Sequence, residues 1–575
     1  MSKKKVAQIV VEALENAGVK RCYGVVGDTL NDVTDAMHHH SQIEWVHVRH
    51  EEVGGFAAGA ESFMTKELSA CAGSCGPGSL HFINGLFESH RNGAPVVLIA
   101  SQLPTNVLGT NFPQEVDYMP IYQSCSVFCE LITNPHEAKR IVMSACQAAL
   151  TEKGVAVVIL PSDISATVVE DLPVLQQYQP KQPLIRPIDD EIIKMANLLN
   201  AGERVGIYAG AGCEGSHEEL IALCEKLKAP IAHTSRGKDF VEANNPYNVG
   251  MTGMMGIKSG YEMIEHCDTL LILGADFAWS QFYPKQAKII QVDIDVKKLG
   301  LRHAIELGVI GHIKETLQAL LPHLTQKTSS EFLDKYVDLY HKTTAKLDKK
   351  AVADHENLIH PQYLTELLDQ YADDDALATA DGGSATVWLL RHFKTNGKRR
   401  TLISLKHGTM ANAMPQSIGL QKAYPNRQVI SLSGDGGLTM LMGDLLTIVQ
   451  EKLPIKIVII NNGALDFVEL EMKADGMVNS CTNLQNPDFA KMADVIGIKG
   501  FSAKGSHELE ATVKEFLAHD GPAILDAHTS RLELIFPPHA TPSNFENMTL
   551  YGTKAILGGE GSTFFDMLKN NFLEK

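Results

Sequence analysis

Short runs of β-branched and other apolar residues alternate with helical patterns along almost the whole chain of 575 residues. A strand followed by a helix and a second strand forms a parallel sheet whose faces the helices cover. The alternation therefore predicts an α/β fold of doubly wound parallel sheets. The clearest predicted strands are residues 96–99, 155–160, 270–273, 289–292 and 455–460.

Two stretches of unusual composition divide the chain. Residues 172–187 hold four prolines without a helical period, and residues 325–331 are polar and lead into a lysine-rich helical connection that reaches about residue 357. A domain takes about 150 residues. We therefore expect three α/β domains, at residues 1–180, 186–330 and 355–535, followed by a tail at residues 536–575.

Charge and cysteine content exclude several classes of protein. Asp and Glu total 68 against 51 Lys and Arg, a net charge of −17. Such a surface repels phosphate backbones, so nucleic acid is not an expected partner. The ten cysteines are scattered, mostly in apolar stretches, as expected of reduced thiols in a cytoplasmic protein. Glu12 and Glu15 make residues 6–18 an amphipathic helix rather than a signal peptide, and no apolar run is long enough to span a membrane.

The first and third predicted domains look like distant copies of each other. In the first, His50 precedes a helix of small residues, and Gly76-Pro77-Gly78 follows the next predicted strand. In the third, His407 and Gly434-Asp435-Gly436 recur at nearly the same spacing. Two unrelated strand–helix–strand units can share such a pattern by chance, which is the alternative. If the segments are copies, their chemistry has diverged, because a proline cannot bind a metal where Asp435 can.

The sharpest motif is Gly434-Asp435-Gly436, which follows a predicted strand and is separated by 24 residues from Asn461-Asn462. The glycines let backbone N–H groups approach a phosphate. Asp435 and Asn462 offer the oxygen ligands that Mg²⁺ prefers. Both residues are expected at the carboxyl ends of neighbouring parallel strands, where α/β sheets bind ligands. The motif predicts a diphosphate and magnesium site, with an ordinary tight turn as the alternative.

With the asparagine pair at this interval, the motif resembles that of the thiamine-diphosphate-dependent enzymes. The resemblance implies that Asp435, the side chain of Asn462 and the carbonyl of Ala464 hold Mg²⁺. It also implies that Gly408 binds the aminopyrimidine through its carbonyl and that Met410 holds the cofactor bent. The full cofactor-binding set implied in this domain is Gly408, Thr409, Met410, Asp435, Gly436, Gly437, Asn462, Gly463, Ala464, Leu465, Asp466, Phe467 and Val468.

A carboxylate pair, Glu51-Glu52, follows His50 at the start of the first small-residue helix. Such a pair is most often a solvated helix start, stabilised by the helix dipole. Thiamine chemistry needs a carboxyl group beside the pyrimidine for proton exchange, and in the family this glutamate directly follows a histidine. The resemblance therefore implies that Glu51 is catalytic. Because Glu51 and Asp435 lie in different domains and the family builds each site across a dimer interface, we expect a homodimer or a homotetramer.

Glycines also stand at the predicted strand ends of the middle domain, among them Gly210-Ala211-Gly212, which alone is a weak dinucleotide signal. Residues 50–61, 71–92, 245–254 and 436–462 resemble the bacterial pyruvate oxidase branch of the family, the pyruvate:quinone oxidoreductases, and this resemblance extends over nearly the whole chain. It implies that the middle domain binds FAD; a purely structural domain is the alternative. The implied FAD contacts are Thr252, Gly253, Met254, Met255, Ala275, Asp276, Phe277, Ala278, Trp279 and Asp293.

The same resemblance implies oxidative decarboxylation of pyruvate to acetate and CO₂, with electrons passing through FAD to ubiquinone. Gln114 and Phe467 would line the substrate pocket. Three positions depart from the pattern of the branch: Pro113 replaces a phenylalanine, Asp466 replaces a glycine, and His312 replaces an aspartate. The first two bear on substrate preference or turnover and the third on a flavin contact.

The tail contains an amphipathic segment. Ser562 is placed to cap a helix over residues 563–573. This helix either docks on the protein's own surface or binds membrane lipid reversibly. The resemblance implies lipid binding and a protein that is peripheral on the cytoplasmic face of the inner membrane. The residues that share the apolar face are Phe564, Phe565, Met567, Leu568 and Phe572.

Three alternatives stay open. The first is a phosphate- and oxygen-dependent pyruvate oxidase, which makes acetyl phosphate. Glu471 matches an active-site glutamate of that relative, so it does not discriminate between the two kinds of oxidase. Acetolactate synthase transfers to a second ketoacid and uses no flavin redox step. A catalytically silent protein of the same fold is the third alternative. The joint presence of Glu51, Asp435 and Asn462 argues against it. Product analysis with pyruvate alone separates the enzymes.

Overall fold

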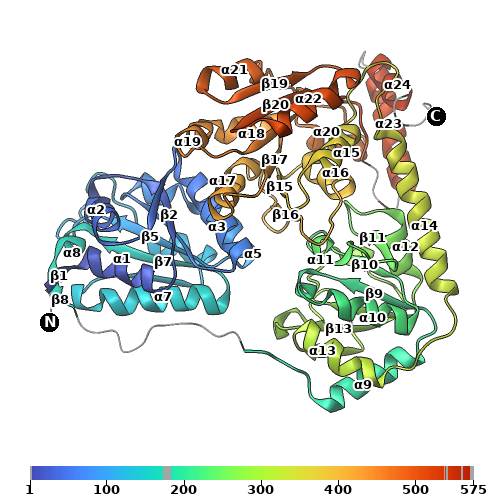
Figure 1. The fold of residues 1–575 in the computed structure, drawn as a ribbon, viewed down its shortest axis with the longest axis horizontal. Coiled ribbons are helices and arrows are strands. Elements are labelled where there is room, and N and C mark those ends of the chain that lie inside the picture. Colours follow the sequence, from blue (N-terminus) through green and yellow to red (C-terminus); the bar gives the residue numbers. More distant parts are fainter. Residues whose placement is uncertain are drawn as a thin grey trace.

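The structure, a computed structural model, describes residues 3–171, 183–535, 538, 542–557, 561–569 and 571. Three parallel six-stranded sheets with flanking helices lie in these residues, one in each predicted α/β segment (Figure 1). The predicted fold class is therefore confirmed. Most of the proline-rich stretch after the first domain lies outside the described residues.

The first domain has the strand order β3-β2-β4-β5-β7-β6. Helix α1 occupies the predicted amphipathic segment and buries seven apolar or small side chains against the sheet. A short antiparallel pair, β1 (Lys3–Lys5) with β8 (Val168–Glu170), joins the two ends of the domain. The strands are β2 (Arg21–Val25), β3 (Glu44–His47), β4 (Ser69–Gly73), β5 (Val96–Gln102), β6 (Phe128–Leu131) and β7 (Val155–Pro161). The helices are α1 (Val6–Asn16), α2 (Asn31–His40), α3 (Glu51–Thr65), α4 (Pro77–Leu80), α5 (Ile83–Asn92), α6 (Tyr118–Tyr122), α7 (Ala138–Glu152) and α8 (Ser162–Ala166).

The middle domain has a different order, β11-β10-β9-β12-β13-β14. Its chain then continues into a long helix, α14 (Glu331–Leu347), which fills the predicted helical connection and ends in a 3₁₀ turn, η8 (Asp348–Lys350). The strands are β9 (Val205–Ala209), β10 (Ile231–His233), β11 (Asn248–Met251), β12 (Thr269–Leu273), β13 (Lys288–Asp293) and β14 (Leu307–Ile310). The other helices are α9 (Asp189–Ala201), α10 (His217–Leu227), α11 (Lys238–Val241), α12 (Lys258–His266) and α13 (Ile313–Leu320).

The third domain has the order β16-β15-β17-β18-β20-β19. The strands are β15 (Leu377–Ala380), β16 (Arg400–Ile403), β17 (Val429–Gly434), β18 (Lys456–Asn461), β19 (Lys499–Ala503) and β20 (Ala523–His528). The helices are α15 (Pro361–Tyr371), α16 (Ser384–His392), α17 (Ala413–Ala423), α18 (Asp435–Leu441), α19 (Leu445–Gln450), α20 (Asp466–Ala474), α21 (Phe489–Ile496) and α22 (Ser506–Ala518).

The strand orders bear on the predicted relationship between domains. When the strands of each sheet are numbered along the chain, the first and third domains both read 2-1-3-4-6-5, whereas the middle domain reads 3-2-1-4-5-6. His50 and His407 both follow the second strand of their sheet, and the Gly76 and Gly434 motifs both follow the third. The shared topology favours two diverged copies over chance similarity.

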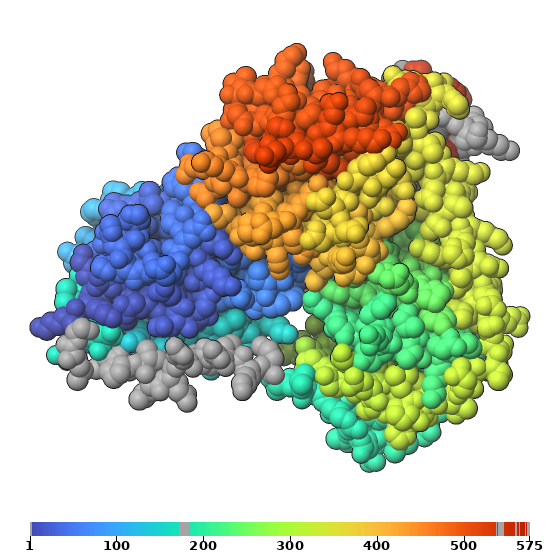
Figure 2. Space-filling model, viewed as in Figure 1, coloured from blue at the N-terminus to red at the C-terminus, as the bar shows by residue number. Residues whose placement is uncertain are grey.

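The third domain packs against the other two. Helix α17 lies so close to α3 that a Cβ on Gly419 would stand 2.0 Å from the carbonyl oxygen of Ala57. One buried apolar cluster runs through both domains and includes Ala57, Met414 and Ile418. Towards the middle domain, the buried carboxylate of Asp239 accepts hydrogen bonds from the backbone N–H and the hydroxyl of Thr401, at 2.8 and 2.9 Å. Figure 2 shows the third domain, orange to red, between the blue first domain and the yellow helical connection.

The tail forms two helices, α23 (Pro542–Leu557) and α24 (Gly561–Leu568), of which the sequence predicted only the second. Helix α24 begins before Ser562, and the predicted end at residue 573, with Phe572, lies outside the described residues. Met567 is buried against Tyr551 and Ala555 of α23, whereas Phe565 is 60% exposed. The described part of the apolar face is therefore mostly docked on the protein itself. None of the helices within the described ranges is long and apolar enough to cross a membrane.

All ten cysteines lie in described residues and none forms a disulfide. Eight are buried, Cys129 is half-buried, and Cys481 is exposed. Burial raises the pKa of the Cys146 thiol to about 12. The predicted burial of most of the cysteines is confirmed.

Candidate active site

Asp435 begins α18 directly after β17 and is 2% exposed. Its Oδ1 accepts a hydrogen bond from the backbone N–H of Gly436 (2.9 Å), and its Oδ2 accepts from Gly463 N–H (2.8 Å) and Asn486 Nδ2 (2.7 Å). Burial raises the pKa of this carboxyl, which these neutral donors oppose. No lysine or arginine in the described part of the chain lies within ion-pair distance of it. A buried carboxylate that lacks a basic partner fits a bound divalent cation.

The predicted asparagine ligand lies in a turn that meets this aspartate. Asn462 follows β18, and its Oδ1 accepts from the backbone N–H of Ala464 at 3.1 Å. Gly463 has φ +68°, the left-handed region that favours glycine, and its N–H reaches Asp435. The backbone N–H of Leu465 donates to the carbonyl of Thr482 (2.9 Å), which anchors the far side of the turn. The structure thus brings the two predicted ligand loops together at one edge of the sheet.

Space around the glycines agrees with the predicted cofactor contacts. Cβ atoms built on Gly408 and Gly434 would meet nothing within 4 Å, so open room lies beside both. A Cβ on Gly436 would lie 3.8 Å from Met410 Cε, which places Met410 next to the diphosphate loop. A Cβ on Gly437 would stand 2.3 Å from Asp381 Oδ2, so no larger residue fits there. These observations fit a site that a phosphorylated cofactor fills.

The predicted pocket residues begin α20. Asp466 is 7% exposed, and no donor among the described residues bonds its Oδ1. Burial is the main reason that the pKa of Asp466 is raised to about 7. Phe467 is half-buried and Val468 is 37% exposed. The aspartate that departs from the family pattern is therefore a buried carboxyl poised between its charged and neutral forms at neutral pH.

Glu51, the predicted catalytic acid, is the first residue of α3 and is 9% exposed. Its Oε2 lies 2.9 Å from His81 Nδ1, and the His81 ring stacks on that of His50 with 4.7 Å between centroids. Gln114 is exposed, has φ +70°, and its Oε1 lies 3.5 Å from Cys75 Sγ. Both predicted residues thus lie around the loop that begins α4.

Within one chain, Glu52 rather than Glu51 is linked to the third domain. Asn84 Nδ2 donates to Glu52 Oε1 (2.7 Å) and to Thr409 Oγ1 (3.3 Å), and Asn84 Oδ1 lies 2.7 Å from His407 Nε2. No hydrogen bond or ion pair joins Glu51 to a described residue of the third domain. The backbone N–H groups of Arg49 and His50, just before Glu51, do contact this domain: they donate to the carboxylate of Asp444 at 2.7 and 3.1 Å.

The middle domain presents its predicted contacts at the carboxyl ends of β11, β12 and β13. Thr252 is 3% exposed, and its hydroxyl has no hydrogen-bond partner among the described residues. Asp293 ends β13, is 4% exposed, and accepts from the backbone N–H of Asp295 at 2.9 Å. Burial raises the pKa of Asp293. Met254 and Trp279 are 45% and 37% exposed, so they border an open surface. An orphan hydroxyl and a carboxylate at a strand end fit a nucleotide ligand.

Comparison with known families gives three matches, one for each domain. Residues 4–121 match the N-terminal TPP binding domain of thiamine pyrophosphate enzymes, residues 192–320 the central domain, and residues 381–527 the C-terminal TPP binding domain. The chain belongs to the thiamine pyrophosphate enzyme family. Thiamine pyrophosphate is the diphosphate predicted from the Asp435 motif.

Known members of this thiamine pyrophosphate family align with nearly the whole chain. A Bacillus subtilis protein named "Putative thiamine pyrophosphate-containing protein" is 32% identical over 92% of both chains. A pyruvate oxidase of Lactiplantibacillus plantarum is 28% identical over 90% of this chain and 87% of its own length. A protein of Methanocaldococcus jannaschii named probable acetolactate synthase large subunit is 29% identical over 91% of both.

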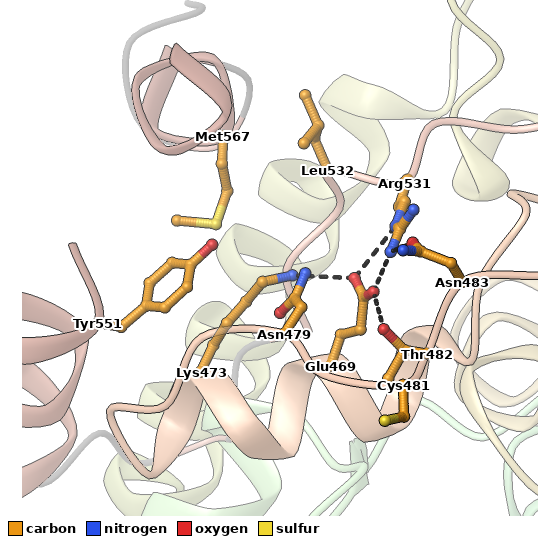
Figure 3. Close-up of a pocket in the computed structure, with 10 residues that line it drawn as sticks. All are labelled: Glu469, Lys473, Asn479, Cys481, Thr482, Asn483, Arg531, Leu532, Tyr551 and Met567. Atoms are coloured by element: carbon orange, nitrogen blue, oxygen red, sulfur yellow. Dashed lines mark hydrogen bonds and ion pairs between the residues drawn. The ribbon is translucent and has the colours of Figure 1, made fainter. Parts of the chain in front are cut away.

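A cavity of about 240 Å³ lies beside the cofactor loops of this thiamine pyrophosphate enzyme (Figure 3). At its base the fully buried Glu469 accepts hydrogen bonds from Thr482 Oγ1 (2.6 Å) and Arg531. The wall on the other side comes from the tail, through Tyr551 and Met567. Sequence reasoning missed Glu469, Arg531 and also Asn486, because their partners lie in distant segments that no motif spacing connects.

The third departure from the family pattern has a structural role. His312 precedes α13, its backbone N–H donates to the carbonyl of Ile185 (2.9 Å), and its Nδ1 accepts from Ile185 N–H (3.0 Å). The histidine thus fastens the chain that enters the middle domain.

Proposed function

We propose that this thiamine pyrophosphate enzyme decarboxylates pyruvate oxidatively to acetate and CO₂, using thiamine diphosphate, Mg²⁺ and FAD, and passes the electrons to membrane ubiquinone. The observation that carries this proposal is that one chain has both the Asp435 site and a middle domain whose strand ends fit a nucleotide ligand. A relative named pyruvate oxidase, similar over 90% of this chain, supports the substrate and the oxidative outcome.

In this proposal Asp435, Asn462 and Ala464 supply carboxylate, amide and carbonyl oxygens to Mg²⁺, a donor set that suits a hard cation. The backbone at Gly436 and Gly437 faces the diphosphate, and the Gly408 carbonyl and Met410 position the aminopyrimidine. Bound thiamine diphosphate supplies the nucleophilic carbon and the electron sink for decarboxylation.

The chain's own residues then hold and move protons. Glu51 exchanges a proton between its carboxyl oxygen and the cofactor ring, while His81 at 2.9 Å fixes the orientation of the other oxygen. Gln114 and Phe467 line the substrate pocket. With a pKa of about 7, Asp466 can hold a proton at Oδ1 beside that pocket and give it up again at neutral pH.

We propose that Glu51 of one chain completes the Asp435 site of another, in a homodimer or a homotetramer. The support is the family resemblance together with the placement of Glu51 and Asp435 in different domains. In the middle domain we assign FAD to the strand ends that carry Thr252, Trp279 and Asp293 and their neighbours. The amphipathic helix α24 is the candidate for reversible contact with membrane lipid on the cytoplasmic face.

The test is anaerobic mixing of the purified protein, supplied with thiamine diphosphate and Mg²⁺, with pyruvate while flavin absorbance is followed. We expect rapid bleaching, recovery with a quinone analogue, and one acetate for each pyruvate. Glu51→Gln should abolish bleaching, and Glu67→Gln, at an exposed carboxylate just after the same helix, is the control. Protein without flavin, or flavin that stays oxidised, would refute the oxidase assignment.

Acetolactate synthase is the second candidate function, because a relative with that name is 29% identical over 91% of this chain. It predicts acetolactate as the product and no bleaching. Acetyl phosphate formed only with added phosphate would instead indicate the phosphate-dependent oxidase. For the tail, co-sedimentation with phosphatidylglycerol vesicles should be lost when the chain is ended before Gly561.

A further inference from the structure

Three side chains that the proposed function does not use converge where the helical connection meets the third domain. Asp348 begins η8 at the end of α14, Glu366 lies in α15, and His392 is the last residue of α16. One ligand atom from each residue lies within 4.8 Å of the corresponding atoms of the other two. Elements that are distant in the sequence thus present two carboxylates and an imidazole to one point.

The imidazole of His392 is the most unusual member of this group. The residue is 2% exposed, and neither ring nitrogen has a hydrogen-bond partner among the described residues. Buried polar groups are nearly always bonded, so two orphan nitrogens on one ring indicate that a partner is missing. Glu366 Oε2 is also buried and lacks a partner in the described part of the chain.

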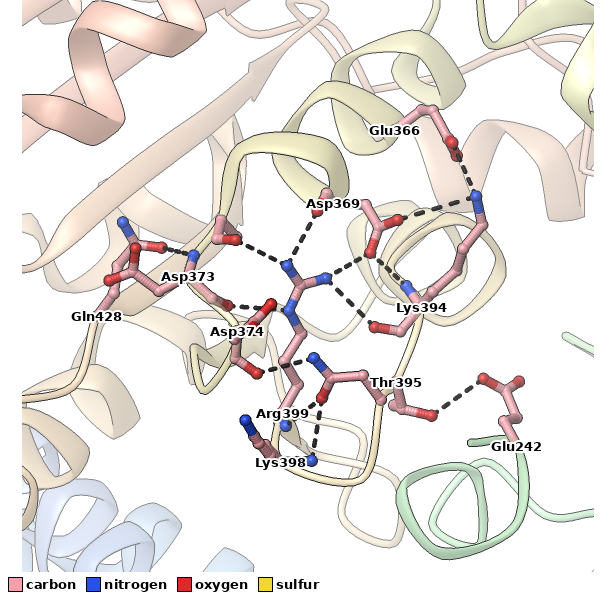
Figure 4. Close-up of polar contacts among 12 residues, drawn as sticks. Glu242, Glu366, Asp369, Asp373, Asp374, Lys394, Thr395, Lys398, Arg399 and Gln428 are labelled. Atoms are coloured by element: carbon pink, nitrogen blue, oxygen red, sulfur yellow. Dashed lines mark hydrogen bonds and ion pairs between the residues drawn. The ribbon is translucent and has the colours of Figure 1, made fainter. Parts of the chain in front are cut away.

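Charged groups of both signs surround this point. Lys394 Nζ donates to Glu366 Oε1 at 2.8 Å (Figure 4), so this lysine does not bond the other carboxylate oxygen, Oε2. Arg391 instead donates to the carbonyl oxygens of Met255 and Gly256, both at 3.1 Å, and Lys238 pairs with Glu242. Burial lowers the pKa of His392 to about 3, and the positive charges of Arg391, Lys394 and Lys238 lower it further, so these charges oppose a cation that the two carboxylates attract. The two carboxylates of Asp348 and Glu366 lie beside the imidazole, and both of its ring nitrogens lack a partner among the described residues.

We propose that Asp348, Glu366 and His392 bind a divalent transition-metal ion of the zinc class. One imidazole nitrogen with two carboxylate oxygens is a mixed donor set that suits Zn²⁺ better than Mg²⁺, which prefers oxygen alone. Zinc ligands about 2.0–2.2 Å from the ion lie about 3.3–3.6 Å apart in tetrahedral geometry. The three ligand atoms, which all lie within 4.8 Å of one another, come closer together around the ion, and water completes the coordination.

Such an ion would tie α14 to α15 and α16, and so would join the connection from the middle domain to the third domain. It is separate from the proposed magnesium site, which offers oxygen ligands alone. The assignment does not depend on the reaction that the enzyme catalyses.

The test measures metal binding rather than activity. The full chain is treated with a chelator, dialysed, and supplied with excess thiamine diphosphate and Mg²⁺ so that the cofactor site is filled. Zinc bound at equilibrium is then counted, and Co²⁺ in its place is followed by visible absorption. The exposed run His38-His39-His40 at the end of α2 can bind zinc by itself, so these residues are replaced by alanine in every protein compared.

We expect one zinc per chain, a visible Co²⁺ spectrum, and a rise in melting temperature on zinc addition. Asp348→Asn and Glu366→Gln should lose all three effects. Asp338→Asn should retain them, because Asp338 is an exposed residue of α14, the helix that leads to Asp348. No zinc beyond the background, or equal binding by Asp348→Asn and Asp338→Asn, would overturn the proposal. Circular dichroism without metal establishes that each variant folds.

Discussion

Asp381, at the carboxyl end of β15, is expected to make the third domain less stable as the pH rises. It is 3% exposed, its Oδ1 accepts from the backbone N–H of Ala413 at 2.9 Å, and its Oδ2 faces Gly437. No basic side chain in the described residues pairs with it. Burial raises the pKa of Asp381 from 3.8 to about 7. The folded state therefore favours the neutral carboxyl, whereas the unfolded chain ionises near its ordinary pKa.

The sign and size of the effect follow from this difference. Between about pH 4 and pH 7 the unfolded state loses its proton first, so the free energy of unfolding falls by ~1.4 kcal/mol per pH unit and by ~4 kcal/mol in all. Between pH 5 and pH 8 this carboxyl alone should account for a loss of ~2–3 kcal/mol. Asp381→Asn keeps the shape without the ionisation and should remove that loss.

Hydrogen exchange read on peptides that cover β15 and α16 measures this free energy locally. Comparing variant with wild type at each pH cancels the intrinsic pH dependence of exchange. Asp374→Asn, an exposed substitution just before β15, is the control and should follow the wild type. If Asp381→Asn and wild type lose the same stability from pH 5 to pH 8, then Asp381 is ionised throughout and the reasoning is wrong.

Three further changes have calculable outcomes. Arg531→Met removes the guanidinium partner of the buried Glu469, which keeps Lys473 (3.4 Å) and Thr482 as partners; the free energy of unfolding should fall by ~1–3 kcal/mol, and denaturant titration should show partial recovery when Glu469→Gln is added. Gly419→Val forces a side chain against a carbonyl of α3 that lies 2.0 Å from the Cβ position; a loss of ~1–3 kcal/mol should appear as faster hydrogen exchange in α3 and α17, and unchanged exchange would contradict the packing. His360 Nδ1 lies 2.5 Å from Glu533 Oε1, and although burial opposes the charge on His360, Glu533 raises its pKa. The pair of charged His360 with Glu533 therefore stabilises the fold below about pH 6.5, and this stabilisation is lost at higher pH. His360→Gln should lower the melting temperature more at pH 6 than at pH 9.

The sequence was sufficient for the sheets and for the cofactor loops, because both depend on local patterns. Alternation of strands and helices fixes a parallel sheet, and the carboxyl ends of neighbouring strands place Asp435 beside the turn of Asn462. The matching strand orders of the first and third domains also agree with a repeat that residue identities alone left open.

Partnerships between distant segments were not predictable in this way. Asn84 joins Glu52 to Thr409 across two domains, and Asn486 completes the hydrogen bonds of Asp435 from a loop with no motif. The sequence predicts only one helix in the tail because α23 lacks a strong apolar period of its own and depends on packing against α20 and α24. Propensity and spacing carry no information about such contacts.

The exposure of Cys481 gives the enzyme a natural attachment point for a probe. It is the one exposed thiol among ten, and it borders the cavity between the third domain and the tail. A thiol-selective fluorophore or spin label therefore attaches here first, without prior removal of the other cysteines. A label at this position would report, in the otherwise unaltered protein, on any relative movement of the two walls.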